Sequence, residues 1–194
     1  MEQFDIVDEN GQPTGETVER TFAHENGIRH RAAHIWIARK GEGGWQVLLQ
    51  KRSMDKDSFP GMLDTSSAGH IQAGDEPLES AIRELFEELG IAAQKEDLHF
   101  AGMFQIHFEK PFHGRLFKDY EIAYVYIYTN AVEIEQLTLQ KEEVETVAWF
   151  DLEDVYQACQ RHDERFCVPI EGLEIAWKYL VAKCQGQADR ANAL

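Results

Sequence analysis

Three glutamates, Glu84, Glu87 and Glu88, are the residues of this sequence best placed to do chemistry together. They lie in segment 77–89, where apolar residues recur every three or four positions, which predicts an amphipathic helix. The three carboxylates fall roughly opposite its apolar face. Like charges this close, near a helix C-terminus, repel one another and oppose the macrodipole. Because Mg²⁺ binds carboxylate and phosphate oxygens, the pattern predicts a metal site rather than a solvated acidic face.

The ends of this helix can also be predicted. Pro77 suits the first turn, where its missing N–H has no intrahelical partner, and Asp75 and Glu76 lie at the capping end. Gly90 is placed to end the helix, because glycine readily adopts the left-handed conformation of a C-terminal cap. A loop that begins at Gly69 leads into it. We therefore expect a loop followed by a short helix.

Segment 69–91 resembles the Nudix box, in which a Gly and an acidic residue precede Arg-Glu-aliphatic-x-Glu-Glu-x-Gly-aliphatic. The core reads RELFEELGI at 83–91. One position departs from the family pattern, because Asp75 stands where the family usually has Glu. In the family that Glu typically pairs with the box Arg, which is Arg83 in this sequence. The resemblance implies the Nudix fold, an α+β domain with a mixed β-sheet sandwiched between α-helices. It also implies Mg²⁺ or Mn²⁺ as cofactor. The implied metal ligands and catalytic residues are Glu84, Glu87, Glu88 and Glu121, with Arg83 orienting a box glutamate.

Length and composition place limits on these expectations. The 194 residues are 43% hydrophobic, enough for one sizeable core, and the net charge of −16 disfavours nonspecific binding to nucleic acid or to an anionic membrane. Three cysteines without metal-ligand spacing predict reduced thiols in a cytoplasmic protein. We expect one domain over 1–184, a flexible tail over 185–194, and a small-molecule diphosphate as partner. A homodimer is left open.

The pattern of apolar and turn-forming residues predicts the remaining elements. We expect a β-hairpin from two strands within 4–20, a second strand pair, and four later strands. Two helices should follow. The predicted later elements are the strand pair 34–39 and 45–51, a polar loop 53–61, the strands 99–108, 120–128, 132–137 and 144–150, a basic aromatic loop 110–118, and the helices 151–161 and 171–184.

The resemblance extends beyond the box, to the type I isopentenyl diphosphate isomerase branch of the Nudix superfamily, over roughly residues 4–128. It is carried by QPTG at 12–15, FAH at 22–24, RHR at 29–31, QKRS at 50–53, FPG at 59–61 and SAGH at 67–70. Those isomerases have a catalytic Cys before the Gly-His pair, where this chain has Ala68, and they lack box glutamates that this chain keeps. The Ala68 methyl group cannot protonate an alkene, which disfavours isomerisation. The retained box glutamates can bind a metal, so both differences favour metal-assisted hydrolysis.

The same branch implies a second metal site. The residues at its metal-binding positions are His24, His30, His70, Asp119 and Glu121. Asp119 and Glu121 alternate along a predicted strand, so both point to the same face. Three imidazoles and two carboxylates could hold Zn²⁺, Mn²⁺ or Mg²⁺. The alternative is that the histidines are structural or at the surface and the carboxylates are edge charges.

Phosphate recognition requires cations near the carboxylates. Lys51, Arg52 and Lys56 precede the turn at 59–61, and the matching basic residues of the isomerase branch face the diphosphate. The alternative is that they are ordinary charges at the end of a strand.

The sequence therefore predicts a Mg²⁺-dependent Nudix hydrolase that cleaves a diphosphate linkage in a nucleoside-diphosphate-type or related substrate. Glu87→Gln is expected to abolish its activity without unfolding it. Two alternatives remain. Isomerisation of a prenyl diphosphate is disfavoured by Ala68, and a catalytically idle ligand-sensing module is disfavoured by the nearly complete box.

Overall fold

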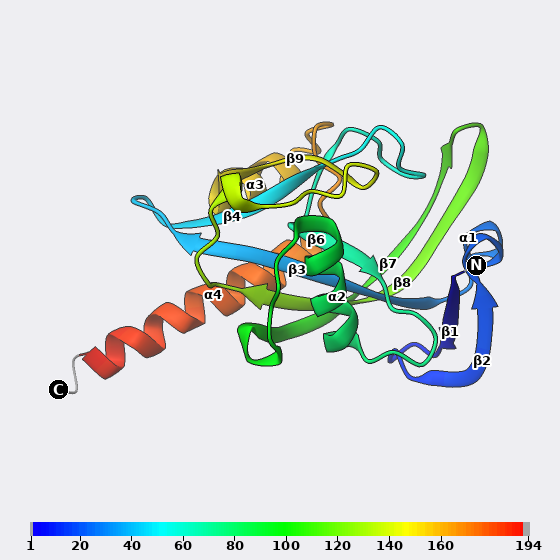
Figure 1. Ribbon diagram of the computed structural model, residues 1–194, viewed down its shortest axis with the longest axis horizontal. Coiled ribbons are helices and arrows are strands. Elements are labelled where there is room, and N and C mark those ends of the chain that lie inside the picture. The colour runs from blue at the N-terminus through cyan, green and yellow to red at the C-terminus, as the bar shows by residue number, and fades with distance from the viewer. Residues whose placement is uncertain (1, 192–194) are drawn as a thin grey trace.

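The computed structural model describes residues 2–191, with side chains described as far as Lys183 (Figure 1). A two-stranded hairpin, β1 (Gln3–Val7) with β2 (Pro13–Glu19), precedes a seven-stranded sheet. The strands of that sheet are β3 (His30–Lys40), β4 (Trp45–Arg52), β5 (Leu63–Asp64), β6 (Ser67–His70), β7 (Leu98–Phe112), β8 (Arg115–Tyr128) and β9 (Val144–Asp151). The helices are α1 (Arg20–Asn26), α2 (Pro77–Leu89), α3 (Leu152–Gln160) and α4 (Ile170–Ala191).

The seven-stranded sheet is mixed, as predicted. Its main path runs β5-β4-β3-β8-β7, while β6 pairs with β3 and β9 pairs with β4. Strand β3 is parallel to β8, from His30 opposite Glu121 onward, and antiparallel to β4 and β6. This register brings the start of β3 beside the middle of β8, which positions the histidines and carboxylates described below.

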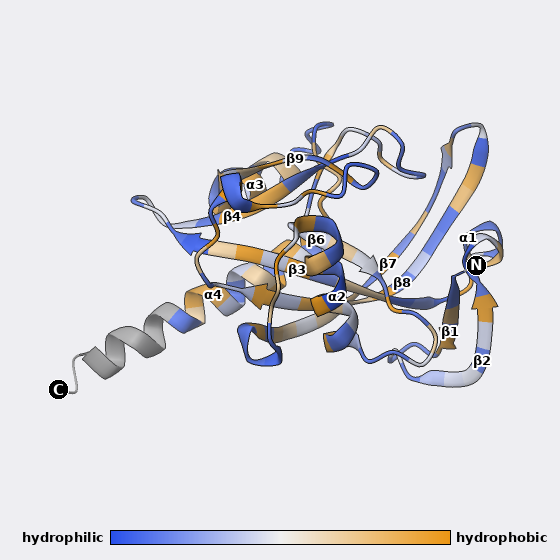
Figure 2. Ribbon diagram, in the orientation of Figure 1, coloured by the Kyte–Doolittle hydropathy of each residue, from blue (hydrophilic) through white to orange (hydrophobic). Residues whose placement is uncertain are grey.

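Two hydrophobic layers cover the two faces of the sheet. Alternating side chains of a strand point to opposite faces, and β3 follows this rule, with Ile35 in one layer and Trp36 in the other. The first layer is completed by α2 through Leu85, and the second by α4 through Leu173. Figure 2 shows the hydrophobic stretch along the centre of β3. The sheet is thus sandwiched between helices, which confirms the predicted α+β fold class.

Helix α2 has the predicted limits. Pro77 occupies its first turn, and Gly90 ends it in the left-handed region with φ of 73°. Glu76 is the N-cap residue but makes no capping hydrogen bond with its side chain. The N-terminal hairpin, the pair β3–β4, the strands β7, β8 and β9, and the helices α3 and α4 are also confirmed.

Two predicted elements differ from the structure. The basic segment 110–118 is not a loop: β7 and β8 continue as a ladder up to a two-residue turn, His113-Gly114, whose φ angles of 50° and 77° suit a tight hairpin. Segment 132–137 forms a 3₁₀ turn at Ile134–Gln136 in place of a strand, because its apolar side chains pack on the α2 layer without a strand partner. The short strands β5 and β6 and the helix α1 were not predicted.

The C-terminal helix is longer than the sequence predicted. It continues to Ala191, past the expected end at Cys184. Residues 192–194 of the predicted tail lie outside the described part of the chain, and the flexibility of 185–194 stays a prediction. No helix within residues 2–191 is both long and apolar enough to cross a membrane.

Candidate active site

A cleft of about 1580 Å³ collects most of the chemistry-bearing residues. Its walls come from β3, β6 and α2, from the loop after β4, from the β7–β8 hairpin and from the segment between α3 and α4. Three groups of charged side chains open into it. They are the α2 glutamates Glu84, Glu87 and Glu88, the cluster with His70, Asp119 and Glu121, and the cations Arg52 and Lys56.

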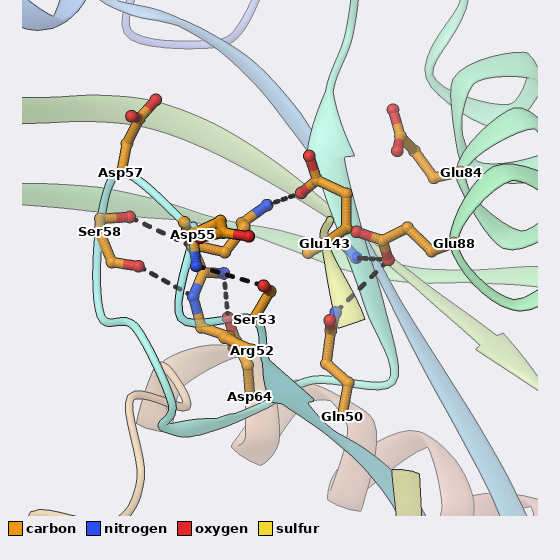
Figure 3. Close-up of polar contacts among 12 residues, drawn as sticks. Gln50, Arg52, Ser53, Asp55, Asp57, Ser58, Asp64, Glu84, Glu88 and Glu143 are labelled. Carbon is orange, nitrogen blue, oxygen red and sulfur yellow. Dashed lines mark hydrogen bonds and ion pairs between the residues drawn. The ribbon is translucent and has the colours of Figure 1, made fainter. Parts of the chain in front are cut away.

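Glu84 and Glu88 lie one turn apart on α2 and are almost completely buried, with 9% and 3% of their surface exposed. The Glu88 carboxylate accepts hydrogen bonds from the backbone N–H of Ala68 at 3.2 Å and from Gln50 Nε2 at 3.4 Å. Figure 3 shows Glu84 and Glu88 projecting from the same helix, with Gln50 bonded to Glu88. Gly69 lies directly against Glu84, and a Cβ atom at position 69 would overlap its carboxylate. The box therefore requires glycine there.

Arg83 holds the outer part of this acidic face. Its Nη1 lies 2.8 Å from Glu84 Oε1 and 3.0 Å from Glu87 Oε2, and its Nη2 donates to the backbone oxygen of His70 at 3.1 Å. Glu87 is the most accessible of the three glutamates, with 49% of its side chain exposed. Asp75 is not among the ion-pair partners of Arg83 in the described chain; its backbone oxygen accepts from Arg31 instead. The expected Asp75–Arg83 pair is thus replaced by pairs within α2.

Burial raises the pKa values of the two inner glutamates. The pKa of Glu84 rises to about 7, mainly through desolvation, although Arg83 opposes the shift. The pKa of Glu88 rises to about 8, through desolvation and then repulsion from Glu84. Two buried carboxylates that repel each other are unfavourable unless a cation or a proton compensates them. This donor set fits a hard divalent cation.

These shifts predict how the metal-free protein responds to pH. Carboxyl pKa values raised above the unfolded value mean that the folded state binds more protons, so stability falls as pH rises through about 7 and 8. Below pH 6.5 the buried histidines have the opposite effect, so that stability rises with pH. The reason is that the pKa of His24 is lowered to about 3, so the unfolded state binds more protons there than the folded state does. We therefore expect the melting temperature of chelator-treated protein to fall between pH 7 and 8.5. Scanning calorimetry with and without Mg²⁺ measures this, and a melting temperature that is flat in both samples would contradict it.

The predicted histidine–carboxylate cluster is assembled in the structure. Its ligand atoms form two overlapping groups, each with all atoms within 4.8 Å of one another: His24 with His30 and His70, and His30 with Asp119 and Glu121. Glu121 Oε1 lies 3.4 Å from His30 Nε2 and 3.2 Å from His70 Nε2. The parallel register of β3 with β8 explains this proximity, because it pairs His30 with Glu121 directly.

Several polar atoms of this cluster are buried without a partner. His24 Nε2, His30 Nε2 and Asp119 Oδ1 have no hydrogen bond within the described chain, although such atoms are normally paired. Burial and the neighbouring histidines lower the pKa of His24 to about 3, so its imidazole is neutral, as a metal ligand must be. Phe4 of β1 stacks on His30 with ring centroids 4.6 Å apart, and Phe117 stacks on His24 at 4.3 Å. The unpaired atoms fit a bound cation.

Two of the three predicted phosphate-binding cations line the cleft. Arg52 pairs with Asp64 at 2.9 Å and donates to Ser58, and Lys56 pairs with Glu143, as Figure 3 shows for the surroundings of Arg52. Lys51 does not line the cleft; it pairs with Glu145 of β9 at 2.9 Å. Successive residues of a strand point to opposite faces, so Lys51 and Arg52 cannot both reach the same site. Lys51 thus lies outside the cleft lining, and a role for it in phosphate binding stays a prediction.

Sequence reasoning missed three residues of the cleft region. Gln50 supports Glu88, Glu143 pairs with Lys56 and acts electrostatically on Glu88, and His34 lies in the cleft wall. The alternation along β4 could have identified Gln50, because it lies two positions before Arg52. No local signal marks Glu143, which lies in a polar loop more than fifty residues after the box.

Known proteins share this arrangement of buried box glutamates, a glycine against them and a mixed sheet between helices. Residues 28–167 match the NUDIX domain family. The chain belongs to this family. It is 41% identical over 167 residues to Nudix hydrolase 3 of Arabidopsis thaliana, covering 85% of this chain but 21% of that protein. It is 37% identical over 154 residues to an uncharacterised Nudix hydrolase of Clostridium acetobutylicum, covering 79% of this chain and 72% of that protein.

Solved structures share the fold. DR0079 from Deinococcus radiodurans superposes with a TM-score of 0.62 at 19% identity, over 82% of this chain and 90% of that one. The C. elegans Ap4A hydrolase, in a binary complex, gives a TM-score of 0.54 at 23% identity, over 78% of this chain and 98% of that one. These likenesses show the Nudix fold alone.

Proposed function

We propose that this protein is a divalent-metal-dependent hydrolase that cleaves a diphosphate linkage in a nucleoside-diphosphate-type or related small molecule. One observation carries the proposal. The buried glutamates Glu84 and Glu88 share a single cleft with the cations Arg52 and Lys56. Metal-dependent hydrolysis of a diphosphate requires carboxylates that bind a cation and, beside them, basic groups that bind phosphate.

The metal-binding residues at the box would be Glu84, Glu87 and Glu88, with Mg²⁺ or Mn²⁺ as the cation. When bound, the cation would polarise phosphate oxygens and lower the pKa of an attacking water. Ala68 N–H and Gln50 orient Glu88, and Arg83 orients Glu84 and Glu87.

Arg52 and Lys56 would bind phosphate oxygens. We assign the general base to a box glutamate rather than to Glu121. Although burial raises it, the neighbouring imidazoles of His30 and His70 hold the pKa of Glu121 well below its usual range, so it is a weak base.

We also propose that the cluster of His24, His30, His70, Asp119 and Glu121 is a second divalent-cation site, and that the chain lies in the isomerase-like branch. The buried unpaired atoms of this cluster support the site. Imidazole-rich sites favour Zn²⁺ and related transition metals. This site would lie in the same cleft as the box.

His30→Ala is expected to remove one equivalent of tightly bound transition metal per chain and to leave Mg²⁺ binding at the box unchanged. Metal content after dialysis, measured by mass spectrometry, gives this number directly. His99→Ala is the matched control, because His99 stacks on Tyr179 of α4, outside the cluster. Equal metal content in His30→Ala and the parent protein would refute the second site.

A panel of diphosphate compounds, assayed with Mg²⁺ or Mn²⁺ and read by product identity, tests the proposed function. We expect phosphate-containing products only when metal is present. Isomerisation of a prenyl diphosphate would instead exchange substrate protons with solvent and release no phosphate. Ala68, which lines the cleft, has no proton to donate. Saturable metal binding without turnover of any compound would favour a ligand-sensing module.

Residues 1–184 would form a single Nudix domain in a cytoplasmic protein, with no nucleic-acid or membrane partner, and a homodimer stays open. The chain spans about a fifth of the length of Nudix hydrolase 3.

A further inference from the structure

One buried imidazole of the cleft lies outside both acidic clusters. His34, in the middle of β3, has 6% of its surface exposed and lines the cleft. Its ring packs edge-on against Phe104, with centroids 5.5 Å apart and planes at 89°. Its Nδ1 is buried and has no hydrogen-bond partner within the described chain. A buried ring nitrogen without a partner is costly, so its retention in the cleft wall requires an explanation.

The neighbours of His34 place its ring in the wall of the cleft. In the sheet, His34 lies directly opposite Ala68 of β6, so the two side chains share a face. The alanine methyl is too small to cover an imidazole. The ring is also within electrostatic reach of two charged pairs, Arg52 with Asp64 and Glu121 with His70. His34 therefore lines the same cleft as both of these pairs.

The state of the ring follows from its burial. Desolvation lowers the pKa of His34, and the opposing pull of Glu121 and Asp64 is smaller, so the imidazole is neutral near pH 7. A neutral imidazole carries one proton, and a buried N–H without an acceptor is rarer than an unpaired acceptor. The proton therefore belongs on Nε2 rather than on the enclosed Nδ1. This leaves one N–H donor for the cleft.

Phosphate is the ligand chemistry that this donor suits. The two cations of the cleft are already paired, Arg52 with Asp64 and Lys56 with Glu143, so carboxylates offset much of their charge. Phosphate oxygens bound there still need hydrogen-bond donors, and a neutral N–H supplies one without further charge. We propose that His34 donates a hydrogen bond from Nε2 to a phosphate oxygen of the bound diphosphate. This inference rests on the proposed diphosphate substrate.

The test measures binding of methylenediphosphonate, a diphosphate analogue that cannot be hydrolysed at its bridge, by titration calorimetry with Mg²⁺ present. His34→Leu removes the donor at similar volume, and we expect the Kd to rise about tenfold or more. His34→Gln places an amide N–H near the Nε2 position, and we expect a Kd within about threefold of the parent value. Phe104→Leu is the packing control. It disturbs the contact of the ring but keeps the donor, so its Kd should stay near that of the parent.

The outcomes separate this inference from the proposed function. Equal Kd values for the parent protein and a folded His34→Leu variant would overturn the role of His34, even if hydrolysis is intact. Weakening by all three substitutions alike would also overturn it, because packing alone would then explain the loss. A parent protein that neither binds the analogue nor hydrolyses any diphosphate would overturn the proposed function itself. If His34→Leu does not fold, His34→Phe, which keeps a planar ring without a donor, replaces it with the same expected Kd.

Discussion

Glu88→Gln is expected to lower kcat for diphosphate hydrolysis by about a thousandfold. The amide has nearly the size of the carboxylate and can still accept the hydrogen bond from Ala68 N–H. It cannot provide the negative charge that a divalent cation needs, and Glu84 alone is left on the inner face of α2. Steady-state rates at saturating Mg²⁺ measure the loss. Because burial of the Glu88 charge is unfavourable without a cation, the metal-free variant should be at least as stable as the parent protein.

Glu79→Gln is the matched control for this substitution. Glu79 lies on the same helix, with 57% of its side chain exposed, and pairs with Lys95 outside the cleft. Exposed pairs of this kind contribute little to stability, so kcat should stay within about twofold of the parent value. Full turnover by Glu88→Gln, with Glu79→Gln equally active, would contradict the assignment of the α2 glutamates.

Gly69→Ala is expected to reduce activity by about a hundredfold through displacement of Glu84. The new methyl group would occupy the position of the Glu84 carboxylate. Because that carboxylate is the far end of a flexible side chain, it can move away without rearrangement of the backbone. Stability should therefore change little while Mg²⁺ affinity and kcat both fall. Calorimetric titration with Mg²⁺ and a thermal melt of the same sample separate these effects.

Gly43→Ala provides the comparison for Gly69→Ala. Gly43 lies in the β3–β4 turn, and a Cβ there would meet nothing within 4 Å. Its activity and Mg²⁺ affinity should match those of the parent protein. If Gly69→Ala also binds Mg²⁺ and turns over normally, the close contact between Gly69 and Glu84 has no functional role.

The α2 region could be predicted because its signals are local. Pro77 and Gly90 predicted its ends correctly, and Leu85 and Leu89 are buried as the apolar spacing indicated. The predicted position of the carboxylates was partly wrong, because Glu84 and Glu88 are buried beside these leucines rather than opposite them. The strands β3 and β8 were recognisable from their β-branched and aromatic residues. The resemblance to the isomerase branch then identified His30 and Glu121, which the parallel register brings together.

The rest depends on contacts between segments that are distant in the sequence. Lys51 and Arg52 are adjacent in the chain, yet Lys51 forms an ion pair with Glu145 of β9 while Arg52 lines the cleft and pairs with Asp64. The basic stretch before the His113-Gly114 turn looked like a loop because its charged residues hide the strand alternation. The replacement of the Asp75–Arg83 pair by pairs within α2 likewise depends on side-chain geometry that no spacing rule provides.

The most direct test of metal-dependent hydrolysis follows the fate of water oxygen. A substrate diphosphate that the panel identifies would be turned over with Mg²⁺ in water enriched in ¹⁸O, and the products analysed by mass spectrometry. We predict one ¹⁸O atom in a phosphate product per cleavage, no cleavage after chelation, and about a thousandfold slower labelling with Glu88→Gln. Unlabelled phosphate groups together with proton exchange at substrate carbon, or turnover unaffected by chelation, would contradict it.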